Sequence, residues 1–239
     1  MGVLPTRGGT IRLAQSELTG LPSHRRVQQG LAYVPQGRMI FPALTVLENI
    51  QTGLEKSRSN QVPNELFELF PVLFEMRHRK GGNLSGGQQQ QLAIARALAT
   101  NPRVLLLDEP TEGIQPSIIK DIANALNEIR KLRQITLIVS EQVLSFALAV
   151  ADRILVLERG RRCRHNHRLA VGLIGSIARA DGIAPIAAKG APGALDAGGR
   201  LTTLVFGVLH HAADLAHGCL VKPAPDNLGH GQVLFHIQF

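Results

Sequence analysis

Hydrophobic and polar positions alternate along the first 160 residues in blocks that predict strands followed by helices. Short apolar runs predict strands, and segments with apolar residues three or four positions apart predict helices. The clearest helix carries Ile118, Ile122, Ala125 and Ile129 near this spacing. Strands that alternate with helices indicate an α/β fold with a mostly parallel sheet. The expected strands are 10–13, 31–34, 104–107, 135–139 and 153–157, and the expected helices are 45–53, 63–74, 86–100, 117–132 and 143–151.

The pattern changes at Gly160. Residues 161–239 contain no Glu, seven of the nine His and both Cys of the chain, and their apolar periodicity is weak apart from 201–209. We therefore predict one domain over 1–160 and an irregular, atypical tail over 161–239. Three interpretations of the tail stay open: a C-terminal domain, a disordered extension, or a segment translated from a shifted reading frame. Its His residues lack carboxylate or Cys partners, so we expect no metal site there.

Composition narrows the class of protein only a little. The chain is 44% hydrophobic and 18% charged, which is ordinary for a globular protein. Its net charge is +8, but it has no run of five Lys or Arg and only 4% aromatic residues, so we expect no nucleic-acid partner. No apolar run reaches the roughly 18 residues that span a bilayer, and the start lacks a signal-peptide pattern. We therefore expect an intracellular protein whose membrane contacts run through partner proteins.

The first candidate site opens the helix predicted at 86–100. Ser85 stands at the N-cap position, and Gly86, Gly87 and Gln88 form the first turn. Glycines let a backbone approach a ligand closely, and a helix N-terminus presents free N–H groups to an anion. These residues therefore predict a site for a nucleotide phosphate, although simple helix capping would explain them as well.

The second candidate site lies where two predicted strands end. Asp108 and Glu109 follow the strand 104–107, and Gln36 follows the strand 31–34. The carboxyl ends of parallel strands form the edge at which open α/β sheets bind ligands. Asp108 is expected to hold Mg²⁺ through water, and Glu109 to polarise an attacking water. The Gln36 amide is able to contact both a metal ion and a water, although a solvated Gln and a helix-capping acidic pair are the simpler alternatives.

In their order and spacing, these residues resemble the ATPase subunits of ATP-binding cassette (ABC) transporters. LSGGQ at 84–88 matches that family's signature motif, and VLLLDE at 104–109 matches its Walker B strand with the catalytic glutamate. Gln36 falls at its Q-loop position. The resemblance implies a partial ABC ATPase fold, with a helical signature subdomain at about 45–98.

The same resemblance implies cofactors and site roles. ATP and Mg²⁺ would be bound, with Glu109 as the catalytic residue and Asp108 and Gln36 as Mg²⁺ ligands. In that family two ATPase subunits pair head to tail. The signature residues would then contact ATP held by the partner subunit; these nucleotide-binding residues are Ser85, Gly86, Gly87 and Gln88.

Two segments look like the branched-chain amino acid transporter branch of the family. They are 33–50 and 108–122, and the run 111–117 most resembles the ATPase subunits of urea and short-amide uptake systems. The implied function is to couple ATP hydrolysis to uptake of urea, short amides or branched-chain amino acids. The implied partners are a second ATPase subunit, membrane permease subunits and, through them, a periplasmic solute-binding protein. The implied location is cytoplasmic, on the inner face of a bacterial plasma membrane.

The chain departs from the family pattern at several positions. Residues 1–239 contain no P-loop motif, G-x-x-x-x-G-K-S/T, and we interpret Met1 as an internal start that leaves the chain N-terminally truncated. The family's switch histidine position falls at Glu141, and its usual aspartate after the catalytic glutamate falls at Gln115. An alternative function therefore stays open: a catalytically inactive partner module that supplies only the signature motif.

A permease contact is expected between Gln36 and the signature motif. Phe41, Leu44 and Val46 are candidates for a surface groove that receives a helix of the membrane subunit. The opposite interpretation, that these three side chains belong to the core, stays equally open.

Overall fold

A computed structural model gives the structure of residues 1–239 apart from 7, 55–60, 159–160, 163–202 and 209–239. The strands of the described residues are β1 (Arg12–Leu13), β2 (Ser16–Glu17), β3 (Leu31–Val34), β4 (Val104–Asp108), β5 (Thr136–Glu141), β6 (Arg153–Glu158), β7 (Arg161–Arg162) and β8 (Thr203–Val208). Their α-helices are α1 (Ser23–Gln28), α2 (Val46–Gln51), α3 (Asn64–Leu69), α4 (Pro71–Glu75), α5 (Gly86–Ala99), α6 (Pro116–Arg133) and α7 (Leu144–Val150), joined by the 3₁₀ turns η1 (Thr52–Leu54) and η2 (Gly81–Asn83).

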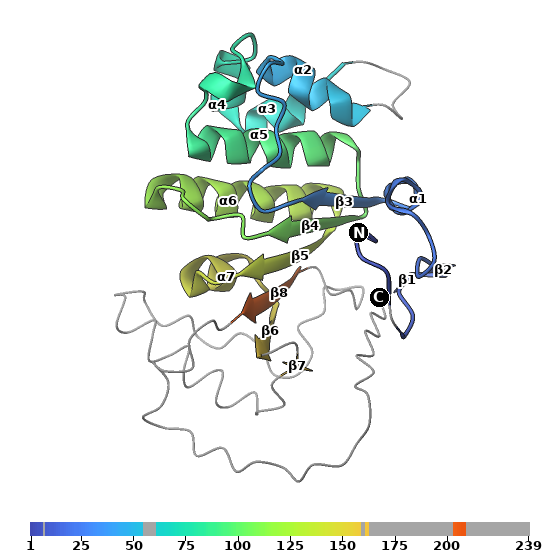
Figure 1. Ribbon diagram of the computed structural model, residues 1–239. Helices are drawn as coiled ribbons and strands as arrows, with labels where there is room; N and C mark the ends of the chain where they lie inside the picture. Colours follow the sequence, from blue (N-terminus) through green and yellow to red (C-terminus); the bar gives the residue numbers. More distant parts are fainter. Residues whose placement is uncertain (7, 55–60, 159–160, 163–202, 209–239) are drawn as a thin grey trace, which may run out of the picture.

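The main sheet is mostly parallel, as the alternation of strands and helices predicts. Its order is β3-β4-β5-β8-β6-β7, and each pair is parallel except β6 with β7. The helices α2 to α5 gather beyond the β3 edge of the sheet, and α6 lies between them and the central strands (Figure 1). The α/β fold class is therefore confirmed, and the carboxyl ends of the parallel strands form one edge.

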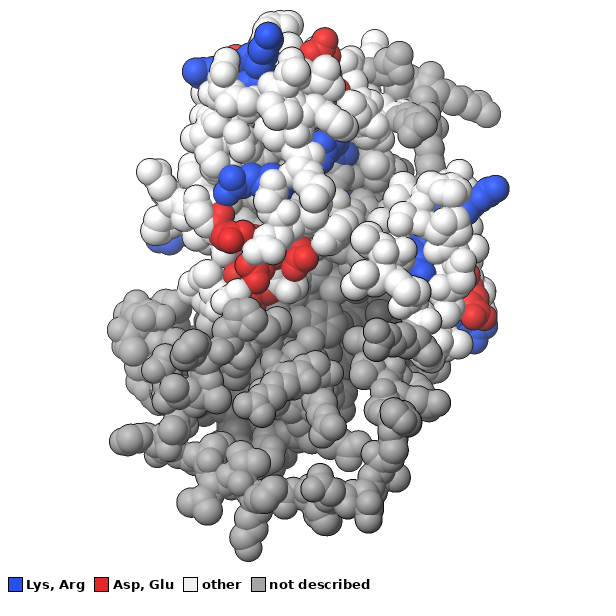
Figure 2. Space-filling view, in the orientation of Figure 1, with Lys and Arg blue, Asp and Glu red and all other residues white. Residues whose placement is uncertain are grey.

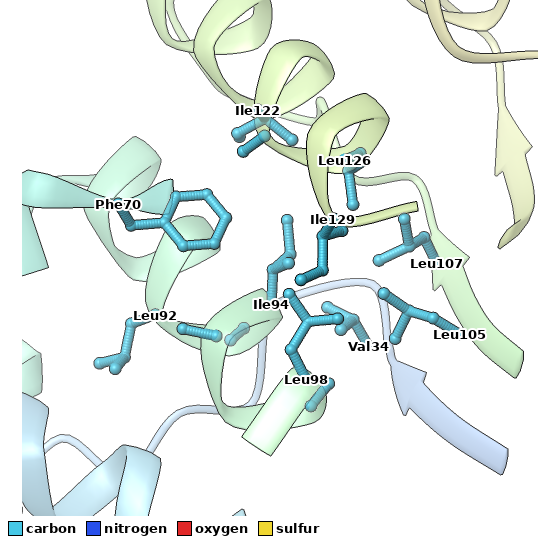
Figure 3. Close-up of a cluster of buried hydrophobic side chains, with 14 of the residues drawn as sticks. Val34, Phe70, Leu92, Ile94, Leu98, Leu105, Leu107, Ile122, Leu126 and Ile129 are labelled. Atoms are coloured by element: carbon cyan, nitrogen blue, oxygen red, sulfur yellow. The ribbon is translucent and has the colours of Figure 1, made fainter. Parts of the chain in front are cut away.

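The hydrophobic core lies where α5 and α6 meet β3 and β4. The apolar side chains labelled in Figure 3 converge there, and each of these side chains exposes 2% or less of its surface. Full burial of an aliphatic side chain contributes about 1.5–3 kcal/mol, so this cluster supplies much of the driving force for folding. Its labelled members are Val34, Phe70, Leu92, Ile94, Leu98, Leu105, Leu107, Ile122, Leu126 and Ile129.

Helix α5 is buried nearly all round, which fixes the position of the signature motif at its start. Its apolar run from Leu92 to Ala99 includes one charged residue, Arg96, and every other member of the run is buried. Helix α5 packs against α2, α4 and β3. A helix with such a pattern lies inside a protein rather than on its surface.

Two predicted elements differ from the structure. The helix expected over 63–74 is divided into α3 and α4 at Phe70, because Pro71 has no N–H to continue the hydrogen-bond ladder. The strand expected over 10–13 is shorter, and it forms a separate antiparallel pair, β1 with β2, outside the main sheet.

Two described strands of the range 161–239 belong to the main sheet. β7 pairs with β6, and β8, which falls within the apolar stretch 201–209, lies between β5 and β6. The predicted boundary at residue 160 therefore does not separate the strands of the sheet. Cys163, Cys219 and the His residues of the tail lie outside the described residues. Within the part that is described, no helix is both long and apolar enough to cross a membrane.

Candidate functional site: a carboxylate cluster at the sheet edge

Glu109 stands at the centre of the cluster, just beyond the end of β4. Its backbone adopts a φ of 44°, a left-handed conformation that is uncommon outside glycine, and its N–H donates to the Ser140 carbonyl at 2.8 Å. The Gln36 side-chain amide donates to one carboxylate oxygen at 3.0 Å, and the Gln142 amide donates to the other at 2.7 Å. Two amides from the loops after β3 and β5 thus orient the Glu109 carboxylate.

Asp108 has a different neighbour, the hydroxyl of Tyr33 on β3. This hydroxyl donates to the Asp108 carboxylate at 3.1 Å. Burial raises the pKa of Tyr33, and the hydrogen bond to Asp108 and its negative charge raise the pKa further. A half-buried carboxylate at the end of a parallel strand suits Mg²⁺, which prefers oxygen ligands and keeps several waters.

The predicted pairing of Gln36 with Asp108 at a metal ion depends on the Gln36 amide oxygen. The amide nitrogen of Gln36 donates to Glu109, and only the oxygen is a possible Mg²⁺ ligand. Within the described ranges, no group of three or more His, Cys, Asp or Glu side chains could hold a metal. The Asp108 carboxylate and the Gln36 amide oxygen are oxygen donors of the kind that Mg²⁺ takes together with water.

Glu141, which the sequence places at the switch position, is 4% exposed. One of its carboxylate oxygens accepts from the Thr111 N–H at 3.2 Å and from the Thr111 hydroxyl at 2.7 Å. The other accepts from the backbone N–H groups of Gln142 and Val143 at 2.7 and 3.0 Å. These hydrogen bonds explain why a carboxylate can be buried here. The structure thus brings Gln142, rather than Glu141, to Glu109.

The signature motif starts α5 as the sequence predicts. Ser85 is the N-cap, and its side chain accepts from the Gln88 N–H at 3.4 Å while the Gln88 side chain accepts from the Ser85 N–H at 2.9 Å. This reciprocal arrangement is a capping box. It orients the first turn of a long helix, whose N-terminal N–H groups are able to bind an anion.

The two signature glycines have different surroundings. A Cβ added to Gly87 would lie 2.8 Å from Ile118 of α6, closer than packed atoms approach. For a Cβ added to Gly86, the nearest atoms would be the guanidinium of Arg38 at 3.4 Å and the Gly113 carbonyl at 3.5 Å. Gly87 is therefore needed for helix packing, whereas Gly86 lies beside the loop that follows Glu109.

Two arginines connect the loop that carries Gln36 with neighbouring segments. Arg38 bonds to the loop after Glu109, and Arg96 belongs to α5. Arg38 donates to the Glu112 carbonyl at 2.9 Å. Arg96 of α5 donates to the Met39 carbonyl at 2.8 Å, and its guanidinium lies 5.3 Å from the centre of the Phe41 ring. Burial lowers the pKa of Arg96. The backbone of Arg38 and Met39 is left-handed, with φ of 67° and 47°, so these contacts stabilise an unusual conformation beside Gln36.

The structure joins some predicted residues and separates others. Gln36 meets Glu109, whereas the side chains of Ser85 and Gln88 each bond to the other residue's backbone N–H. Figure 2 shows acidic side chains gathered in the middle of one face, with basic side chains above them. The sequence reasoning missed Tyr33, Arg38, Arg96, Thr111 and Gln142. The lone charge in the apolar run of α5 is a signal that could have identified Arg96.

The three candidates for the permease contact differ in exposure. Phe41 is 48% exposed, but Val46 is fully buried in the core and Leu44 is half-buried. Val46 therefore belongs to the core, which is the alternative that the sequence left open. Its position in the first turn of α2, which packs against α5, accounts for its burial.

Comparison with known proteins gives consistent matches. Residues 1–112 match the family described as "ABC transporter". Over 161 residues the chain is 42% identical to the high-affinity branched-chain amino acid transport ATP-binding protein BraG of Pseudomonas aeruginosa, covering 66% of this chain and 69% of that protein. It is 34% identical over 163 residues to the probable branched-chain amino acid transport ATP-binding protein LivF of Archaeoglobus fulgidus, covering 67% and 69%. Its fold is similar to the ATP-binding cassette MJ0796, solved as a dimer in a post-hydrolysis state bound to ADP and Pi, with a TM-score of 0.54, 25% identity, and coverage of 60% of this chain and 67% of that one.

Proposed function

The chain belongs to the ABC transporter ATPases, a family that binds and hydrolyses ATP, and we propose that it serves as an ATP-binding subunit of an importer for branched-chain amino acids, urea or short amides. The observation that carries this proposal is Glu109, held by the Gln36 and Gln142 amides at the carboxyl edge of a parallel sheet. A carboxylate so oriented can accept a proton from, or polarise, a water that attacks a phosphate.

The roles of the individual residues follow from this geometry. Asp108 would hold Mg²⁺ through water, with the Gln36 amide oxygen as a further ligand, and the ion would neutralise charge on the phosphates. The Tyr33 hydroxyl restrains the Asp108 carboxylate at the strand end. Glu141 remains buried and joins the loops after β4 and β5, which keeps Gln142 beside Glu109.

The signature residues are proposed to serve a nucleotide held by a second ATPase subunit in a head-to-tail dimer. Support comes from the first turn of α5, where Gly86 offers a backbone that a ligand could approach closely. In this arrangement Ser85 and its neighbours would contact a nucleotide held by the partner's loop.

The transported solute is proposed from two separate sources. The relatives from Pseudomonas aeruginosa and Archaeoglobus fulgidus carry branched-chain amino acid transport in their names. The run TEGIQPS at 111–117 supports urea or short amides instead. We propose that the ATPase works with membrane permease subunits and a periplasmic solute-binding protein, on the cytoplasmic side of a bacterial plasma membrane.

The test is ATP hydrolysis by the chain in a mixed complex. The full chain is purified alone and together with an ABC ATPase subunit that carries an intact P-loop, and ATP binding and phosphate release are measured for each. We expect the mixed complex to hydrolyse ATP and the isolated chain to bind ATP weakly. Micromolar ATP binding by the isolated chain would refute the dependence on a partner's loop.

Two variants separate the signature role from a general effect on folding. Ser85→Ala in this chain is expected to lower hydrolysis by the mixed complex at least tenfold, because the signature side chain would no longer meet the nucleotide. Ser117→Ala is the matched control, since Ser117 is exposed in the first turn of α6. Equal activity of the two variants would contradict the proposed signature role.

A further inference from the structure

The backbone that follows Gln36 has an unusual conformation. Gly37, Arg38 and Met39 are successive residues with positive φ, at 77°, 67° and 47°. Glycine adopts this left-handed region freely, but a residue with a Cβ adopts it only at a cost in free energy. Contacts with other segments must therefore hold Arg38 and Met39 in place. The direction of the neighbouring Gln36 amide then depends on those contacts.

Arg96 of α5 provides one of these contacts. Its Nη2 atom donates to the Met39 carbonyl at 2.8 Å and to the Arg38 carbonyl at 3.4 Å. The chain passes in front of α5 on its way from β3 to α2, as Figure 1 shows, and both carbonyls belong to this passing segment. A single guanidinium nitrogen thus holds two successive left-handed residues to a helix.

Arg96 itself is held firmly on both sides. Its helix is buried nearly all round, and a Cβ added to Gly53 of η1 would lie 2.3 Å from the Arg96 carbonyl, so η1 packs closely against the helix there. The guanidinium lies 5.3 Å from the centre of the Phe41 ring. Asn49 in turn bonds to the Phe41 backbone N–H at 2.8 Å and to its carbonyl at 3.0 Å. The donor therefore has a fixed position relative to the segment that it holds.

The charge of Arg96 has no carboxylate partner among the residues that the structure describes. The ion pairs found there join Arg130 to Asp152 and Arg133 to Glu65. A part-buried cation without an opposite charge is costly, and an apolar side chain would fill the same place in α5 at a lower cost. Stability alone therefore does not account for an arginine here, whereas its bonds to the two carbonyls do.

We propose that Arg96 is a positioning residue for ATP hydrolysis, which acts on Glu109 through the backbone of residues 38–39 and the Gln36 amide. That amide donates to one Glu109 carboxylate oxygen at 3.0 Å, so a displaced backbone would withdraw this donor. Glu109 would keep the Gln142 amide at its other oxygen but would no longer be oriented from both sides. This inference rests on the proposed function, since it assigns a further residue to the same reaction.

The first experiment tests the geometry without requiring hydrolysis. The side-chain amide resonance of Gln36 is followed by NMR in the isolated full chain and is assigned by its loss in Gln36→Ala. We expect Arg96→Met to shift this resonance and to speed hydrogen exchange of the Arg38 and Met39 N–H groups at least about tenfold. Lys120→Met, at an exposed position of α6, is the control and should change neither. An unmoved Gln36 resonance in Arg96→Met would overturn the proposal.

The second experiment measures hydrolysis by the mixed complex with an intact ATPase subunit. Arg96→Met is expected to lower kcat about tenfold and to leave KM for ATP within about twofold, because it removes a positioning contact rather than a nucleotide contact. Arg96→Lys keeps a charged donor and should lower kcat less than about threefold. In a Gln36→Ala background, Arg96→Met should have no further effect, since it acts through Gln36. Equal losses in the two backgrounds would overturn the proposal.

Together the experiments separate this inference from the proposed function. A complex that hydrolyses no ATP, while Arg96→Met still shifts the Gln36 resonance, would contradict the proposed function and support the positioning contact. A hydrolysing complex in which Arg96→Met behaves like Lys120→Met would contradict the positioning role alone. If Arg96→Met does not fold, Arg96→Gln takes its place in both experiments, because glutamine keeps the helix propensity and a polar end but lacks the charge and the reach.

Discussion

The two parts of the candidate site, the start of α5 and the carboxylate cluster, are built in opposite ways. At the start of α5, Ser85 and Gln88 bond to each other across three positions of the chain. In the carboxylate cluster, Gln36 and Glu109 meet across 73 positions. The first arrangement depends on helix capping, and the second on the correct order and register of the strands.

This difference indicates which substitutions should affect only their immediate surroundings. A substitution at the start of α5 alters one helix end that the core holds from behind. A substitution in the carboxylate cluster alters contacts between loops that only the sheet brings together. Stability should therefore be more sensitive at the buried partner of the cluster than at the exposed residues of the capping box.

The largest expected effect is that of Glu141→Ala. Glu141 accepts hydrogen bonds from Thr111, Gln142 and Val143. Its removal would leave the buried N–H and hydroxyl of Thr111 and two part-buried N–H groups without this acceptor. We expect the free energy of unfolding to fall by about 2–4 kcal/mol, measured by denaturant unfolding. Glu112→Ala is the control, because Glu112 is exposed; it should change the free energy by less than about 0.5 kcal/mol. Equal effects of the two variants would show that the hydrogen bonds of the buried Glu141 contribute no more to stability than an exposed side chain does.

An intermediate effect is expected from alanine at the two signature glycines. Gly87→Ala places a methyl group against Ile118 and should lower the free energy of unfolding by about 1–3 kcal/mol. Gly86→Ala places a methyl group 3.4 Å from the end of a flexible arginine and 3.5 Å from the Gly113 carbonyl, which are ordinary contacts, and it gains helix propensity. Its stability should therefore be unchanged or raised by up to about 1 kcal/mol. Thermal and denaturant unfolding of both variants measures this difference.

Ile118 allows a test of why Gly87→Ala should lower stability. If contact with Ile118 explains the loss in Gly87→Ala, adding Ile118→Ala should make the two losses less than additive in a double-mutant cycle. Strict additivity would show that Gly87 is needed for another reason.

The smallest expected effect is a change in the ionisation of Tyr33. Its pKa is raised above the ordinary value of 10.0 by burial, by the hydrogen bond to Asp108 and by the charge of Asp108. A raised pKa in the folded state means that the phenol's contribution to stability is fully present below pH 10 and is lost as the pH rises through the raised pKa. Asp108→Asn should therefore lower the pKa of Tyr33.

This titration can be followed by tyrosinate absorbance, because the chain has a single Tyr and no Trp. Glu109→Gln is the control, since Glu109 bonds to Gln36 and Gln142 rather than to Tyr33. The same shift in both variants would mean that the titration reports the overall charge of the sheet edge and not the contact with Asp108. Addition of Mg²⁺ should lower the pKa of Tyr33 only where Asp108 is intact.

The sequence was sufficient for elements whose cause is local. The capping residue Ser85, the buried strand before Asp108 and the amphipathic pattern of α6 each follow from neighbouring residues, and the structure confirms these elements. The order and spacing of three motifs were enough to predict the family and the fold class. The functional roles of the site residues stay predictions.

The partners of the site residues and the place of each strand in the sheet depend on contacts between distant segments, and the sequence alone does not show these contacts. Neither Tyr33 nor Gln142 has a distinctive neighbourhood, and both gain their partners only through the pairing of β3, β4 and β5. Similarly, an apolar stretch at 201–209 could be seen, but its place in the sheet could not, because parallel pairing leaves no short-range signal. The sequence left the burial of Val46 open for the same reason, because this burial depends on α5, which lies far along the chain.

The contact of Arg96 with the backbone carbonyls of Arg38 and Met39 has a mechanical consequence. Arg96 lies near the C-terminal end of α5, the helix that begins at the signature motif. Helix α5 therefore connects that motif to the backbone of Arg38 and Met39, two and three residues after Gln36. A shift of α5 along its axis would move the signature motif and this backbone segment together.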